Sequence, residues 1–223
     1  MEPLKSATST AASKLHPTDA SKQFLPAFAA AKAYASIFGY ELSFTPGNKA
    51  KEMPQPGKKP VIVPFQEQDI SIKLKNGKTV ALGSVMPEGK QHMGPVKSEA
   101  ALTNELLALV DQYRAKLPKT VPFGAGNAAA TFLPAVAQAS AYAKLHGMKG
   151  VSYEGTGINA KSMEGPVVKA TEEQQLYITD KAGKKHKLGK PIMPEATHIK
   201  TIKSTSALFD EIRALIDKST HAS

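Results

Sequence analysis

The chain of 223 residues contains no cysteine and no tryptophan. The absence of cysteine excludes disulfide bonds, thiolate metal sites, iron–sulfur clusters and a cysteine nucleophile. Only eight phenylalanines and six tyrosines supply aromatic rings. The sequence is therefore poorly suited to binding single-stranded nucleic acid by stacking bases on aromatic side chains.

Long apolar runs are also absent. No segment approaches the run of about 18 apolar residues that a transmembrane helix needs, and the N-terminal residues lack the apolar core of a secretory signal peptide. We therefore expect a soluble protein of the cytoplasm or of a virus particle, with no membrane partner. A composition of 41% hydrophobic and 22% charged residues is typical of a folded globular protein.

Arginine is nearly absent, although the net charge is +10. The 29 Lys and Arg residues include only two arginines, Arg114 and Arg213. The planar guanidinium group of arginine binds guanine through two hydrogen bonds, whereas the ammonium group of lysine acts as a point charge. The composition therefore indicates either attraction to phosphate groups without readout of base sequence, or a simple solvated surface.

The sequence repeats itself at a spacing of between 106 and 108 residues. The segment Phe-Leu-Pro-Ala occurs at 24–27 and again at 132–135. Further matches follow in the same order: 33–35 with 141–143, Gly39 with Gly147, Lys75 with Lys181, Lys78 with Lys184, 86–88 with 193–195, 97–98 with 203–204, and Asp111 with Asp217. Because the order is kept throughout, we predict a tandem duplication.

The repeat divides the chain into four predicted parts. Residues 1–19 form a polar N-terminal arm, residues 20–116 a first α+β unit, residues 117–123 a linker that contains proline, and residues 124–220 a second α+β unit. Each unit, of about 95 residues, is small for an independent core. We therefore expect the two units to pack as a pseudo-twofold pair.

Within each unit the pattern predicts an α-β(3–4)-α order. An alanine-rich helix over 25–38 ends at Gly39, and alternating residues predict a strand over 70–74 with a hairpin turn at Asn76-Gly77. An amphipathic helix then closes the unit, with Ser98 as its N-cap and with Leu102, Leu106, Leu109, Val110 and Tyr113 on one face. The stretches 46–60 and 154–166, rich in proline or glycine, predict two long loops.

Lysines cluster at the predicted hairpin turns, where they are candidates for contact with phosphate groups or with a partner. They are Lys75 and Lys78 in the first unit and Lys181, Lys184, Lys185 and Lys187 in the second. Such turns are suited to binding the phosphate backbone of a nucleic acid or a charged membrane surface. Solvated lysines are equally common at hairpin turns, so the pattern also fits lysines that contact only solvent.

A carboxylate and a histidine recur together after each hairpin. Glu88 precedes His92, and Glu195 precedes His198. Such a pair is compatible with a shaped turn, half of a metal site or an acid–base pair. Since no third or fourth ligand stands at a recognisable spacing, we expect no metal, no cofactor and no catalytic residues there.

Three classes of function fit these features. The first is a non-enzymatic structural or interaction protein within a larger assembly, such as a virus particle. The second is a nucleic-acid-binding protein that uses its lysine-rich hairpins without sequence specificity. The third is a secreted bacterial effector whose signal lies in residues 1–20. In the first two classes the partner is a macromolecule, and no catalytic activity is expected.

Overall fold

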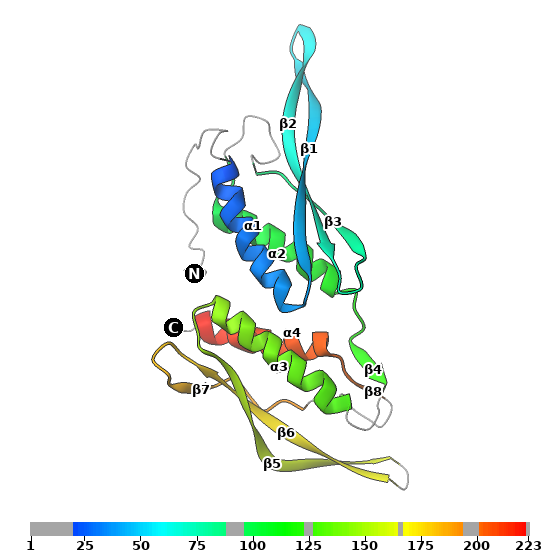
Figure 1. Cartoon of the computed structure of the whole chain (residues 1–223), viewed down its shortest axis with the longest axis vertical. Coiled ribbons are helices and arrows are strands. Elements are labelled where there is room, and N and C mark those ends of the chain that lie inside the picture. Colours follow the sequence, from blue (N-terminus) through cyan, green and yellow to red (C-terminus); the bar gives the residue numbers. More distant parts are fainter. Residues whose placement is uncertain (1–19, 88–95, 123–126, 165–166, 194–200, 222–223) are drawn as a thin grey trace. The chain divides into compact units, whose positions relative to one another are not determined.

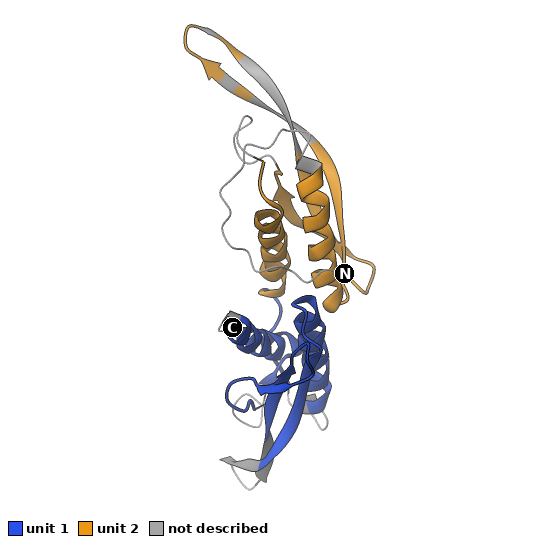
Figure 2. Cartoon of the chain, turned by 90° about the vertical axis from the view of Figure 1, so that its left-hand side faces the viewer, with its two compact units in different colours: residues 1–5, 116–223 blue, residues 6–115 orange. Residues whose placement is uncertain are grey.

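The computed structural model describes residues 20–87, 96–122, 127–164, 167–193 and 201–221 (Figure 1). The described part of the chain is a mixed α+β protein with four helices and several small antiparallel sheets, which confirms the predicted class. It divides between Ala115 and Lys116 into two compact units, here called the N-terminal and the C-terminal unit (Figure 2).

The N-terminal unit consists of a three-stranded sheet with one helix before it and one after it. The sheet has the order β1-β2-β3, and both strand pairs are antiparallel. The elements are α1 (Ala20–Ile37), β1 (Glu41–Gln55), β2 (Lys58–Lys73), β3 (Thr79–Val85) and α2 (Glu99–Arg114).

The C-terminal unit places the same kind of sheet between two helices. Its three-stranded antiparallel sheet has the order β5-β6-β7, and β4 pairs with β8 beside it. The elements are β4 (Thr120–Pro122), α3 (Asn127–Leu145), β5 (Gly150–Glu164), β6 (Val167–Thr179), β7 (Lys185–Lys187), β8 (Thr201–Lys203) and α4 (Thr205–His221). Strand β4 lies in the segment that the sequence assigns to the linker.

Alanines on the first helix of each unit allow the two helices to pack closely. Ala27, Ala31 and Ala35 of α1 are fully buried, and α2 contributes Leu102, Leu106 and Val110 to the same core. In the C-terminal unit, Ala135, Ala139 and Ala143 of α3 are buried in the same way, together with Leu208, Ile212 and Ile216 of α4. The apolar faces that the spacing predicts for the closing helices are therefore buried at these leucines, isoleucines and valine, whereas Leu109, Tyr113 and Leu215 on the same faces are only partly buried.

The predicted N-cap of the closing helix is confirmed and has a counterpart in the other unit. Ser98 Oγ accepts a hydrogen bond of 3.2 Å from the backbone N–H of Ala101 at the start of α2. Ser204 Oγ accepts a bond of the same length from Ala207 N–H at the start of α4. Each serine thereby satisfies one N–H that the first helical turn leaves unpaired.

The predicted long loop over 46–60 is wrong, because this stretch belongs to a hairpin. Strands β1 and β2 stay paired from Glu41 opposite Lys73 out to Gln55 opposite Lys58, whereas β3 pairs only with residues 68–73 of β2. Beyond β3 the sheet is thus a two-stranded ribbon in which both strands are edges. Proline is tolerated on edge strands, since its missing N–H removes no bond when it faces away from the neighbour.

The predicted glycine-rich loop over 154–166 is wrong for a related reason. Strands β5 and β6 pair from Gly150 opposite Thr179 out to Glu164 opposite Val167. The register shifts between Gly155 and Asn159, and Gly157 adopts a φ of 71° within that irregularity. The glycines therefore accommodate a bulge within a hairpin instead of forming a free loop.

Candidate interaction surfaces

The β2–β3 turn of the N-terminal unit exposes the first pair of predicted lysines. Leu74 N–H donates to the carbonyl of Lys78 at 2.9 Å, and Gly77 N–H donates to that of Leu74 at the same distance. Gly77 has a φ of 81°, which the tight turn requires. The turn holds Lys75 and Lys78 on an exposed hairpin end, as the sequence predicts.

The β6–β7 turn of the C-terminal unit is built around Asp180. Its Oδ1 atom accepts a bond of 2.9 Å from Lys184 N–H, and its Oδ2 atom lies 2.8 Å from His186 Nε2. These contacts, with His186 contributing most, lower the pKa of Asp180. The carboxylate of Asp180 therefore stabilises the turn in which it lies.

The four predicted lysines of this turn are all exposed. Lys185 Nζ lies 3.2 Å from Glu154 Oε1, and 5.8 Å from the centre of the Tyr177 ring. In the described part of the chain, no acidic side chain forms an ion pair with Lys181, Lys184 or Lys187. The turn thus combines one neutralised lysine with three unneutralised ones.

Two further lysines lie beside this turn that the sequence pattern did not single out. Lys149 N–H donates to the Thr179 carbonyl at 2.8 Å, directly before Asp180. Lys144 lies in the last turn of α3, close to Gly150, which is paired with Thr179. Only strand pairing brings these residues to the β6–β7 turn, since about 30 residues separate them in the sequence.

Glu88, His92, Glu195 and His198 lie outside the described residues, so their predicted role stays a prediction. Within the described ranges, no group of three or more His, Asp or Glu side chains is placed to hold a metal ion. No helix in those ranges is long and apolar enough to cross a membrane.

The β1–β2 ribbon extends past the helices of the N-terminal unit, and the β5–β6 ribbon does so in the C-terminal unit (Figure 1). In the N-terminal ribbon, Glu52, Lys59, Pro60 and residues 54–57 are exposed. No third strand pairs with the outer part of either ribbon in the described structure. Each ribbon therefore presents backbone N–H and C=O groups along both edges.

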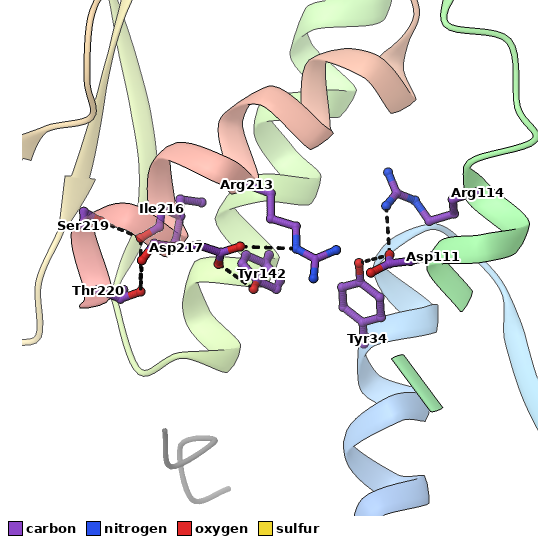
Figure 3. A network of polar contacts seen from close by, with 9 residues as sticks. All are labelled: Tyr34, Asp111, Arg114, Tyr142, Arg213, Ile216, Asp217, Ser219 and Thr220. Carbon is purple, nitrogen blue, oxygen red and sulfur yellow. Dashed lines mark hydrogen bonds and ion pairs between the residues drawn. The ribbon is translucent and has the colours of Figure 1, made fainter. Parts of the chain in front are cut away.

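The two arginines of the chain lie in similar polar clusters, one in each unit (Figure 3). Tyr34 Oη donates to Asp111 Oδ1, and Arg114 lies 3.2 Å from the same oxygen and 4.0 Å over the Phe38 ring. In the C-terminal unit, Tyr142 Oη donates to Asp217 Oδ1 at 2.8 Å, and Arg213 lies 3.7 Å from Asp217 Oδ2. Both arginines therefore serve internal contacts.

No protein-family model, no curated protein and no solved structure matches this chain.

Proposed function

We propose that the protein is a non-enzymatic structural and interaction protein, a component of a larger macromolecular assembly such as a virus particle. The observation that carries the proposal is the pair of β-ribbons that extend beyond the helices of their units. An isolated two-stranded ribbon is marginally stable in water, since it buries little apolar surface. A chain that keeps two such ribbons is best explained by a partner that covers them.

The ribbons offer a simple mode of contact. Strands β1 and β2 each have one free edge beyond the point where β3 stops pairing, at Gln68. A strand from a partner adds to such an edge through backbone hydrogen bonds and needs no special side chain. This mode suits assembly proteins, in which many copies or partners contact one another through extended segments.

Two exposed leucines support the same function. Leu25 of α1 is 54% exposed and Leu133 of α3 is 48% exposed, and both stand in the repeated Phe-Leu-Pro-Ala segment. A large apolar side chain exposed at the same place in both units is suited to a partner contact.

We further propose that the units are two copies of one ancestral unit. Similar contacts support this: Tyr34 with Asp111 and Tyr142 with Asp217, Lys97 with Glu105 and Lys203 with Glu211, and the serine caps of α2 and α4. A duplicated unit would supply the assembly with two related ribbons on one chain.

The test is to shorten the ribbons in the cells that naturally make the protein. One variant replaces residues 48–66 by Asn-Gly, a second replaces residues 160–171 in the same way, and a third combines both changes. Gly47 and Asn159 are each paired with a residue on the other side of the cut, so a two-residue turn can close each hairpin. We expect the wild type to sediment in a large complex and the combined variant to sediment as the free chain. The circular dichroism of the combined variant should lose strand signal and keep the signal of the four described helices, which lie outside both deletions.

A control variant, E52Q/K59Q, keeps the length and pairing of the ribbon and changes only exposed charges. It should sediment with the wild type. A wild-type chain that sediments alone would contradict the proposal. A large complex that still forms with the combined variant, which lacks both ribbons, would also contradict it.

A further inference from the structure

Five lysines surround one end of the C-terminal unit. Lys181, Lys184 and Lys187 come from the β6–β7 hairpin, and Lys149 and Lys144 come from the loop before β5 and from the end of α3. Lys149 Nζ lies 3.2 Å from the point where a Cβ atom on Gly183 would stand. Lys144 Cε lies 3.7 Å from the same point on Gly150, which is opposite Thr179. We call these five residues the lysine cluster.

The charge of the lysine cluster is not neutralised in the described structure. Asp180, the acid within the turn, is bonded to Lys184 N–H and His186. Glu154 is paired with Lys185, which we do not count in the cluster. All five cluster lysines are exposed, and none of them has an ion-pair partner among the described residues. The cluster therefore concentrates five positive charges at one end of the unit, beside the single negative charge of Asp180.

The corresponding end of the N-terminal unit is much less basic. The β2–β3 turn carries Lys75 and Lys78, and Lys73 stands directly opposite Glu41. Opposite charges facing each other across a strand pair offset one another. The repeat places Ser36 and Glu41 where the C-terminal unit has Lys144 and Lys149. Among the described residues, the β2–β3 end of the N-terminal unit therefore lacks a cluster of this strength.

We infer that the lysine cluster binds the phosphate backbone of double-stranded nucleic acid without regard to its sequence. Lysine ammonium groups attract phosphate as point charges and release condensed counterions on binding. Both arginines of the chain are held in the tyrosine–aspartate clusters, so the lysine cluster has no bidentate reader of bases. This inference goes beyond the proposed assembly function and does not depend on it.

Other polyanions fit the lysine cluster less well. Single-stranded nucleic acid is best held by exposed aromatic rings, and Tyr153 is the sole described aromatic residue among the exposed large hydrophobic side chains. It lies on β5, outside the cluster. A membrane surface is bound more stably when an exposed apolar anchor adds to basic charge. In the described C-terminal unit the exposed leucine, Leu133, lies in the first half of α3, whereas Lys144 lies in the last turn of that helix.

The test measures binding of the full chain to a fluorescent 24-base-pair DNA duplex at salt concentrations from 50 to 200 mM. The cluster variant is K144Q/K149Q/K181Q/K184Q/K187Q. The matched control, K22Q/K32Q/K59Q/K73Q/K116Q, removes the same total charge from five exposed lysines that are not candidate phosphate contacts. If each cluster lysine contacts one phosphate, the logarithmic salt slope of the wild type is about −4.5, so that binding weakens about 500-fold over this range.

We expect the cluster variant to lose most of that slope and to bind at least 30-fold more weakly at 50 mM salt, while the control stays within about threefold of the wild type. Two duplexes of unrelated sequence should bind equally. Equal weakening by both variants would overturn the inference, and so would a wild type that does not bind duplex. Binding to vesicles with 30% phosphatidylserine but not to DNA, lost in the cluster variant, would assign the cluster to membranes and reject it as a nucleic-acid site.

Discussion

The hydroxyl group of Tyr34 donates a hydrogen bond of 2.6 Å to Asp111 Oδ1, and so joins the first helix of the N-terminal unit to its last helix. Tyr142 and Asp217 make the same connection in the C-terminal unit. Both tyrosine rings are buried, whereas each aspartate is about one-third exposed. The connection therefore lies where the core of each unit meets its surface.

Replacing Tyr34 or Tyr142 by Phe should lower the free energy of unfolding by about 1 to 2 kcal/mol each. The change removes a hydrogen bond to a charged group, while partial exposure of the aspartates lets water replace some of it. Urea unfolding followed by circular dichroism measures the loss. Tyr113→Phe is the control, because Tyr113 has no hydrogen bond of its hydroxyl in the described structure, and it should change stability by less than about 0.5 kcal/mol. Equal effects at all three positions would contradict the assigned role.

Stability should fall above pH 10 through Tyr142. Burial, and then the hydrogen bond to Asp217, raises the pKa of Tyr142 from its ordinary value of 10.0 to about 12. Because the unfolded chain ionises this phenol first, the contribution of Tyr142 is complete below pH 10 and is lost as the pH rises to 12. The full loss is about 2 to 3 kcal/mol.

The measurement is the tyrosinate absorbance of the wild type minus that of Tyr142→Phe. Subtraction is needed because burial also raises the pKa of Tyr40. The difference curve should have its midpoint near pH 12, and a midpoint near pH 10 would rule out the buried, hydrogen-bonded state of this phenol.

Removing a helix cap should weaken each unit separately. Ser98→Ala and Ser204→Ala each leave an N–H of the first helical turn without its side-chain acceptor, which costs about 1 kcal/mol. Ser98→Asp keeps an acceptor at the exposed cap of α2 and should stay within a few tenths of a kcal/mol of the wild type. Thermal unfolding detects the difference. If Ser98→Asp were as unstable as Ser98→Ala, the loss would not come from the cap.

Gly189→Ala should destabilise the C-terminal unit by about 1 to 3 kcal/mol. Gly189 has a φ of 62°, and an added Cβ atom would stand 2.7 Å from Leu215 Cδ2 on α4. The variant therefore suffers both backbone strain and a clash. Gly57→Ala is a matched control with a φ of 72° and no atom within 4 Å of the added group, so it has the strain alone. Urea unfolding should show a larger loss for Gly189→Ala than for Gly57→Ala, and the reverse order would contradict the packing of Leu215 against this glycine.

The helices and tight turns could be predicted from the sequence because their signals are local. The spacing of Leu102, Leu106 and Val110 predicts a helix face, and Asn76-Gly77 predicts a turn. The ribbons could not be predicted from the sequence, because prolines and glycines usually mark loops. The pairing of each strand also depends on a second strand that is distant in the sequence. The lysine cluster was predicted in part: the turn lysines are adjacent in sequence, whereas Lys144 and Lys149 reach the turn only through the pairing of β5 with β6.

The placement of the two arginines has a consequence for regulation. Arg114 and Arg213 are engaged in internal clusters, so the lysine cluster consists of primary amines alone. An acetyl group converts such an amine into a neutral amide, whereas guanidinium groups are not neutralised by that modification. The charge at the β6–β7 end can therefore be removed one step at a time by acetylation, while the arginine contacts of both units stay intact.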